Sequence, residues 1–254
     1  MKLLNQLIPA LSALAIFILL QSLISAPKNI FYVILAAVLL TVFSIWRLTG
    51  QKLMSGKFWR FLITPLLFMG SAVAFYIFLE GPIFRRLFVL GVAVLLFAYL
   101  EIIFLRFHYR PKYEPYSLEN ITVHLDLLAI FFAASSFFSL MLFLNTNFWL
   151  LALLFVGIGF LAAGQLIWAS GLTLAVGWPP AAILVLLTGE VFYVVSFLPT
   201  SVYVNGLIVA LAYYFFSGLI RNWLLDIRES LVIKRYLIVS LVCLIIILLT
   251  AKWI

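Results

Sequence analysis

Charged residues are scarce in this sequence of 254 residues. Lysine, arginine, aspartate and glutamate together make up 9% of the chain, whereas hydrophobic residues make up 67%. A typical soluble domain is about a quarter charged and about half apolar. No hydrophilic stretch reaches the length of about 50 residues that a separate soluble domain needs. We therefore expect one integral membrane domain over residues 1–254.

Cysteine and histidine, which often form metal centres and nucleophilic sites, are also rare. The chain has one cysteine, Cys243, and two histidines, which excludes an internal disulfide and a cysteine-based metal site. It contains no phosphate-binding glycine loop, no histidine pair at metal-ligand spacing and no G-x-S-x-G motif. We expect no metal and no cofactor, and we favour a function that is not enzymatic.

Long apolar runs fill most of the chain and predict about nine transmembrane helices. The runs are continuously apolar, without the alternation that strands of a membrane barrel show. The fold class is thus predicted to be an all-α, polytopic transmembrane bundle. The predicted spans are residues 4–25, 30–46, 61–79, 87–105, 121–144, 148–170, 180–198, 203–220 and 236–254.

Lysine and arginine near the helix ends predict the orientation of the chain, because cytoplasmic loops carry an excess of them. With a cytoplasmic N-terminus, one side of the membrane collects Lys2, Arg47, Lys52, Lys57, Arg60, Arg106, Arg110, Lys112, Arg221, Arg228, Lys234 and Arg235. The other side receives Lys28, Arg85, Arg86 and Lys252. We therefore expect a cytoplasmic N-terminus and an outside C-terminus. The net charge of +8 reflects this bias, so we expect contact with membrane lipids and no binding of nucleic acid.

Glu190 is the most informative polar residue, because it falls near the middle of the predicted span 180–198. An ionisable side chain within a membrane is costly and by default indicates function. Glu190 could accept a coupling proton or bind a cationic substrate, with Gln165 lining the path. The alternative is a neutral Glu190 that is hydrogen-bonded between helices, for instance to Gln165, Tyr193 or Ser196.

A second group of polar residues is predicted at the cytoplasmic side. It consists of Glu101, Tyr99, His124, Asp126 and Gln165. His124 and Asp126 are two positions apart and lie about 200° from each other around a helix, so they cannot form a metal pair on one face. The nearby segment 106–117 mixes aromatic residues with Arg106, Arg110 and Lys112, which suits contact with anionic lipid headgroups or a charged substrate.

Two further patterns concern helix packing. In residues 221–235, apolar residues share one helical face between charged ones, which predicts a cytoplasmic amphipathic connector; frayed ends of two long helices are the alternative. Gly159 and Ala163 form a small-residue face that permits close packing of helices. Through this face the chain could associate with other membrane proteins or with a second copy.

These observations leave three hypotheses for the function. The first is a non-enzymatic component of a membrane assembly, which predicts no sizeable polar cavity. The second is a carrier of small solutes or lipids with a proton-sensitive Glu190, which predicts a water-reachable cavity at this residue. The third is a membrane-embedded enzyme that uses Glu101, His124 or Asp126 on a lipid-linked substrate. The chain resembles uncharacterised bacterial polytopic membrane proteins, a resemblance that implies the bacterial cytoplasmic membrane and no particular activity.

Overall fold

The structure is a computed structural model that describes residues 2–226, 230–251 and 253. These residues divide into two compact units, Met1–Leu125 (unit 1) and Asp126–Ile254 (unit 2), and each unit is described by itself. The described part of the chain is all-α, so the predicted fold class is confirmed. Its long helices are α1 (Lys2–Ser25), α2 (Ile30–Thr49), α3 (Gly56–Phe78), α4 (Pro82–His108), α5 (Ser117–Leu144), α6 (Phe148–Ala169), α7 (Leu174–Val195), α8 (Val202–Leu224) and α9 (Ser230–Thr250).

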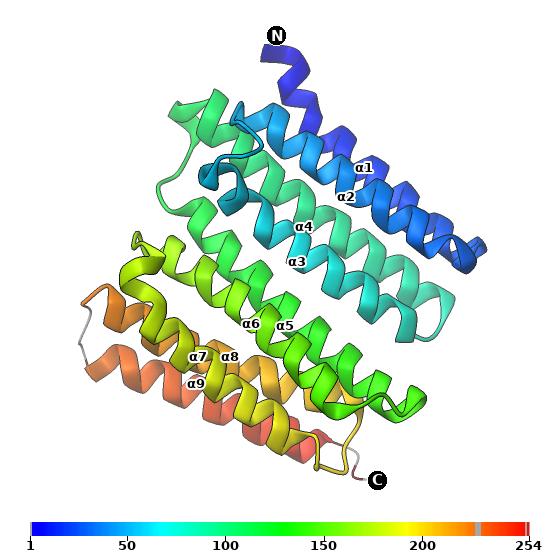
Figure 1. The fold of residues 1–254 in the computed structure, drawn as a ribbon, viewed down its shortest axis with the longest axis vertical. Coiled ribbons are helices and arrows are strands. Elements are labelled where there is room, and N and C mark those ends of the chain that lie inside the picture. The colour runs from blue at the N-terminus through cyan, green and yellow to red at the C-terminus, as the bar shows by residue number, and fades with distance from the viewer. Residues whose placement is uncertain (1, 227–229, 252, 254) are drawn as a thin grey trace. The chain divides into compact units, whose positions relative to one another are not determined.

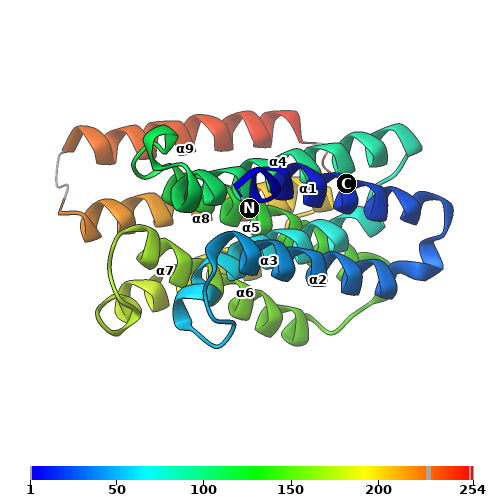
Figure 2. The same ribbon diagram turned by 90° about the horizontal axis from the view of Figure 1, so that it is seen from above.

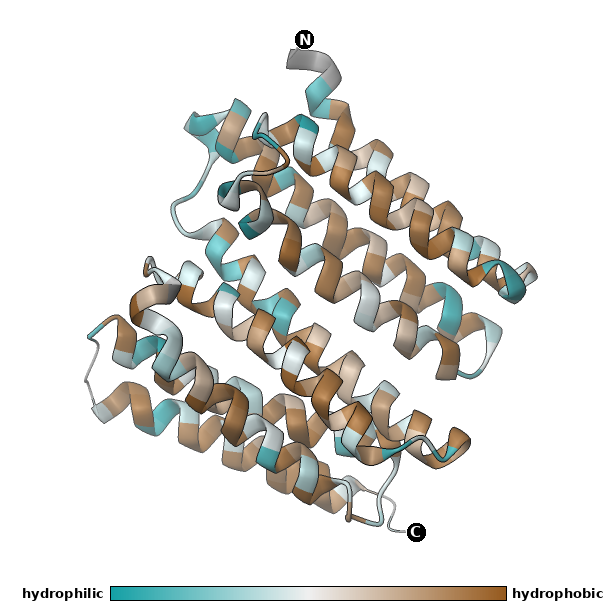
Figure 3. Ribbon diagram, viewed as in Figure 1, coloured by the Kyte–Doolittle hydropathy of each residue, from teal (hydrophilic) through white to brown (hydrophobic). Residues whose placement is uncertain are grey.

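Nine of the described helices are long and apolar enough to cross a bilayer. The shortest of them, α2, has 20 residues, and at about 1.5 Å per residue it covers the hydrocarbon thickness of about 30 Å. Figure 3 shows apolar residues along the lengths of the helices and polar ones mainly toward their ends. The chain is therefore a multi-pass membrane protein. Its orientation stays a prediction from the basic residues.

Short polar turns end the helices and reverse the chain. Gly50 follows α2 with a φ of 62°, a left-handed conformation that glycine adopts without strain. Ser55 and Ser201 cap α3 and α8, because each side chain accepts a hydrogen bond from a backbone amide in the first turn. Asn147 does the same for α6. Because these turns are short, consecutive helices within each unit run antiparallel (Figure 1).

Unit 1 contains α1 to α4 and the first turns of α5. Helix α1 packs against both α2 and α4. Ser12 on α1 and Ser44 on α2 are buried, and their hydroxyl oxygens lie 2.7 Å apart. The buried Tyr99 hydroxyl on α4 donates a hydrogen bond of 2.8 Å to the Phe61 carbonyl on α3. Such interhelical hydrogen bonds stabilise a bundle in which lipid and core are equally apolar.

Unit 2 contains the rest of α5 and helices α6 to α9. Helix α8 approaches its neighbours closely at two glycines. A Cβ atom on Gly206 would overlap the Ser135 side chain of α5, and one on Gly218 would overlap the Tyr236 ring of α9. Helix α9 lies beside α8 (Figures 1 and 2) and contains no buried residue. Unit 2 thus has a close-packed interior with α9 on its periphery.

Several boundaries differ from those predicted. Helix α7 begins at Leu174 and not at residue 180. Prolines often mark a helix start, but Pro179 and Pro180 lie in the second turn of this helix. In the stretch 221–235, the described residues form the end of α8 and the start of α9, and residues 227–229 lie outside the described residues. The amphipathic connector stays a prediction.

Candidate functional site: a groove between α6 and α7

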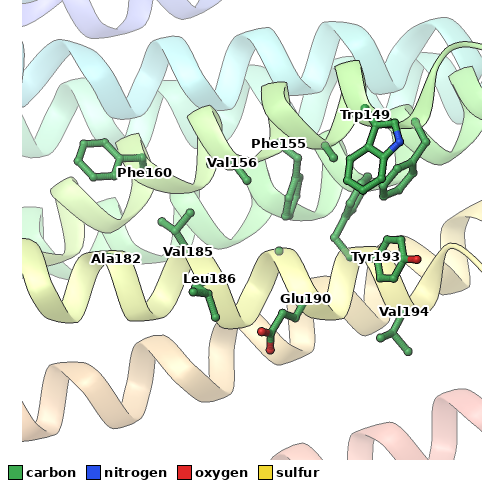
Figure 4. Close-up of a pocket in the computed structure, with 14 residues that line it drawn as sticks. Trp149, Phe155, Val156, Phe160, Ala182, Val185, Leu186, Glu190, Tyr193 and Val194 are labelled. Carbon is green, nitrogen blue, oxygen red and sulfur yellow. The ribbon is translucent and has the colours of Figure 1, made fainter.

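A groove with a volume of about 770 Å³ lies between α6 and α7 in unit 2. Nearly all the surface that lines it is apolar (Figure 4). Its lining residues are Phe148, Trp149, Ala152, Phe155, Val156, Phe160, Ala182, Val185, Leu186, Gly189, Glu190, Phe192, Tyr193 and Val194. The volume falls within the range of about 300–1,000 Å³ that is typical of small-molecule sites.

The helical period places the lining residues of α7 in two neighbouring rows. Val185, Gly189 and Tyr193 form one row at intervals of four residues, and residues 182, 186, 190 and 194 form the next. Gly189 contributes no side chain, and a Cβ atom there would stand 3.8 Å from the Val156 side chain. Small residues on both helices, including Ala152, leave the space that the groove occupies.

Aromatic rings surround one end of the groove, which we call the aromatic end (Phe148, Trp149 and Tyr193). The Trp149 and Tyr193 rings are stacked, with centroids 6.4 Å apart and an interplanar angle of 22°. The Phe148 ring meets Tyr193 edge to face at 5.5 Å. Trp149 and Tyr193 are both exposed. Exposed tryptophan and tyrosine at a helix end are typical of the membrane–water interface.

Next to these rings, Phe192 forms part of the groove wall. Its side chain is 1% exposed, and its ring stacks on Phe155 with centroids 4.4 Å apart. The Phe138 ring of α5 stacks on Phe192 at 4.7 Å. These stacked rings form the wall between the groove and the interior of unit 2.

Glu190 lies close to the aromatic end and not in the middle of its helix, whereas the predicted span 180–198 places it near the middle; its depth in the membrane stays a prediction. It stands five residues before Val195, the last residue of α7, which places it about 7.5 Å from the helix end. The difference arises because the predicted span begins at residue 180, whereas α7 begins at Leu174. The Glu190 side chain is exposed, and its carboxyl points away from α6 (Figure 4). Within the described residues no hydrogen bond joins it to Gln165, Tyr193 or Ser196.

Gln165 lies at the opposite end of α6 from the aromatic end. It follows Trp149 by sixteen residues, or about 24 Å along the helix. The residue is 3% exposed, and its Oε1 atom has no hydrogen-bond partner in the described part of the chain. Gln165 is absent from the groove lining, so the structure does not bring it together with Glu190 on one path.

The other residues of the predicted cytoplasmic group do not form a common site in either unit. Glu101 in unit 1 is half-buried, and among the described residues of this unit it makes no hydrogen bond to His124. His124 is exposed, and its Nδ1 lies 2.7 Å from the Asn120 carbonyl oxygen. Asp126 belongs to unit 2, is 1% exposed and lies within electrostatic range of Tyr213. His124 and Asp126 therefore occupy different faces of α5, as their spacing predicts.

Basic residues of the segment 106–117 lie at one end of unit 1. Arg106 forms an ion pair of 2.8 Å with Glu119, and its guanidinium lies 5.9 Å from the centre of the Phe61 ring on α3. Arg110 and Lys112 lie in the short turn η2 (Arg110–Lys112) and are exposed. Arg106 is thus partly neutralised within the protein, whereas Arg110 and Lys112 are open to the surroundings.

The small-residue face of α6 is occupied within unit 2. Gly159 and Ala163 are buried, and a Cβ atom on Gly159 would stand 3.8 Å from the Val185 side chain of α7. The face therefore packs α6 against α7. Association with another protein through it would require these two helices to separate.

Sequence reasoning found Glu190 and named Tyr193 as a possible partner, but it did not predict the groove that these residues line. A signal was present, because Tyr193 follows Glu190 by three positions and so shares its helical face. The pairing of α6 with α7 at Phe148 and Trp149 depends on tertiary packing. Among the described residues, no group of three or more histidine, cysteine, aspartate or glutamate side chains could hold a metal ion. Comparison with protein-family models, curated proteins and solved structures finds no match.

Proposed function

We propose that this protein is a non-enzymatic, multi-pass membrane protein that binds and carries a lipid or a similar amphiphile in the groove between α6 and α7. One observation carries the proposal: an apolar groove of about 770 Å³ has a single charged side chain, Glu190, among the described residues that line it. An amphiphile has the matching distribution of one polar end and a long apolar part.

The lining favours a lipid over a small hydrophilic solute. Phe155, Val156, Phe160 and Leu186 offer no hydrogen-bonding side-chain atoms to a solute in the body of the groove. A hydrophilic solute that left water for such a surface would lose hydrogen bonds without replacement. An acyl chain has no hydrogen bonds to lose in such a groove.

Glu190 also favours a lipid carrier over a component of a larger assembly. The apolar side of α6 would suit a partner helix, as that interpretation expects. However, a carboxyl inside a helix–helix interface requires a polar group on the partner. An amphiphile brings its own polar headgroup to the exposed side chain. The enzyme hypothesis is less supported, because Glu101 and His124 share no hydrogen bond in the described part of unit 1.

We further propose that Arg110 and Lys112 contact anionic lipid headgroups. Both are exposed at a helix end of unit 1, and the Lys112 ammonium lies 5.4 Å from the centre of the Tyr109 ring. A basic residue with an aromatic neighbour at a helix end suits the headgroup region. These residues lie in unit 1, whereas the groove lies in unit 2.

Photochemical labelling tests whether the groove holds lipid. The protein is placed in nanodiscs that contain a phospholipid with a photoreactive group on its acyl chain, and labelled peptides are identified by mass spectrometry. We expect labels on α6 and α7 at the groove. Ala182→Trp fills the groove, since Ala182 is one of its lining residues, and should reduce labelling by about tenfold.

Leu153→Trp is the matched control, because Leu153 lies on α6, is 69% exposed and is not a lining residue. It adds the same ring to the lipid-facing surface without entering the groove. Equal labelling of the groove peptides in the Ala182→Trp and Leu153→Trp variants would contradict the proposed function.

A further inference from the structure

The charged residue at the aromatic end of the groove is Glu190, and none of the described basic residues of unit 2 lies near it. Among the described residues that line the groove, Glu190 is the only charged one. The described basic residues of unit 2 are Arg221, Lys234 and Arg235. They lie in the last turn of α8 and the first turns of α9, nearly a full helix length from the aromatic end. A ligand headgroup at Glu190 therefore meets the carboxyl group of this residue and no described basic side chain of unit 2.

The aromatic rings beside Glu190 also favour a positively charged headgroup. Tyr193 follows Glu190 by one helical turn, and its ring is stacked with Trp149. Trp149 is 73% exposed, so one ring face is available to a ligand. The faces of aromatic rings attract cations, and ammonium groups most commonly bind where several such rings gather. A carboxylate and exposed rings at one end of a groove together favour a positively charged headgroup.

The remainder of the groove fits the apolar part of the same molecule. From Trp149 to Phe160 the lining of α6 extends over eleven residues, or about 16 Å. This length begins at the interfacial rings and leads toward the centre of the helix. Glu190 is exposed, so packing does not fix its rotamer, and the carboxyl is free to turn toward a headgroup at the aromatic end.

We infer that the groove selects an amphiphile whose headgroup carries an ammonium group, with Glu190 as the carboxylate partner and Tyr193 and Trp149 as the aromatic contacts. This inference rests on the proposed function, because it names the ligand class of the same groove. An anionic headgroup is repelled by Glu190, and a neutral one gains neither the ion pair nor the cation–π contact. We expect a preference of about tenfold for an ammonium over a hydroxyl headgroup, which corresponds to about 1.4 kcal/mol.

Competition between probes of equal chain length tests this selectivity. Nanodiscs of a glycolipid with an uncharged sugar headgroup, which neither attracts nor repels the probes by charge, hold the protein and the photoreactive lipid. Dodecyltrimethylammonium, dodecanol and dodecyl sulfate are then added separately, and the concentration that halves labelling of the groove peptides is measured. We expect the ammonium probe to compete at about tenfold lower concentration than dodecanol, and the sulfate to compete least.

Two variants test whether the preference for the ammonium probe depends on Glu190. Glu190→Gln should keep the labelling of the groove and lose the advantage of the ammonium probe. Glu80→Gln removes an exposed carboxylate at the turn between α3 and α4 and should keep that advantage. If the groove is labelled but the three probes compete equally, the inference is wrong and the lipid-binding proposal stands. If wild-type protein shows no label in the groove, both are wrong.

Discussion

The contact between α5 and α8 at Gly206 allows a quantitative test of the packing in unit 2. A Cβ atom at this position would lie 2.9 Å from the Ser135 backbone nitrogen and 3.0 Å from its Cα atom, and it would overlap the Ser135 hydroxyl. Optimal contacts between such atoms are about 3.5–4.0 Å long. Gly206→Ala therefore requires the backbones of the two helices to move apart, and rotation of one side chain cannot relieve the overlap.

The expected cost follows from this geometry. A radial gap of about 0.5–1 Å removes between a quarter and a half of the dispersion energy along the contact. Overpacking of a well-packed core costs about 1–3 kcal/mol. We expect Gly206→Ala to lower the free energy of unfolding by this amount. Gly157→Ala on α6 is the matched control, because nothing lies within 4 Å of its added Cβ atom. The control should be neutral, or stabilising by up to about 1 kcal/mol.

Both variants are unfolded with dodecyl sulfate in mixed micelles under identical conditions, and circular dichroism is used to monitor the loss of helix. A second variant tests the cause of the loss. Ser135→Gly in the Gly206→Ala background removes the hydroxyl but leaves the nearby backbone atoms, so it should restore only part of the stability. Equal stability of the Gly206→Ala and Gly157→Ala variants would refute the proposed close contact of α5 with α8.

Two further substitutions test the groove wall and the lipid contacts. Phe192→Ala removes a ring that is 1% exposed and stacked on Phe155, and it should lower the free energy of unfolding by about 3–5 kcal/mol; in the same unfolding assay, a loss below about 1 kcal/mol would show that the rings do not form a packed wall. Lys112→Ala should weaken the retention of phosphatidylglycerol by about 1 kcal/mol, measured by native mass spectrometry. Because Lys112 is exposed, this variant should unfold like the wild type, and unchanged lipid retention would contradict the headgroup contact.

The membrane-spanning character of the chain could be read from the sequence, because it depends on the length and composition of single segments. A helix that satisfies its own backbone hydrogen bonds needs no other element to be stable in lipid. The nine apolar runs therefore predict the helices, and the structure confirms them. The separation of His124 from Asp126 also follows from local geometry, since two residues two positions apart on a helix cannot share a face.

The start of α7 was predicted less accurately, because prolines occur both at helix starts and within the first turns of a helix. Pro179 and Pro180 are typical of a helix start, yet α7 begins five residues before the first of them. This difference placed Glu190 near the centre of its span in the sequence and about 7.5 Å from the helix end in the structure. The change matters for function, because a carboxylate near the end of a span is less costly than one at the centre of the bilayer.

The sequence by itself determined that the chain is a bundle of membrane helices, that its ionisable residues are few, and that Glu190 is among the residues that could bind a ligand. Only the tertiary structure decided which helices are neighbours. It brought Trp149 on α6 against Tyr193 on α7, buried the Gly159 and Ala163 face between these helices, and placed Gln165 far from Glu190. The physical reason is that a groove is formed by the rotation and register of two helices together, and in lipid these are set by side-chain packing between helices and not by the apolarity of either one.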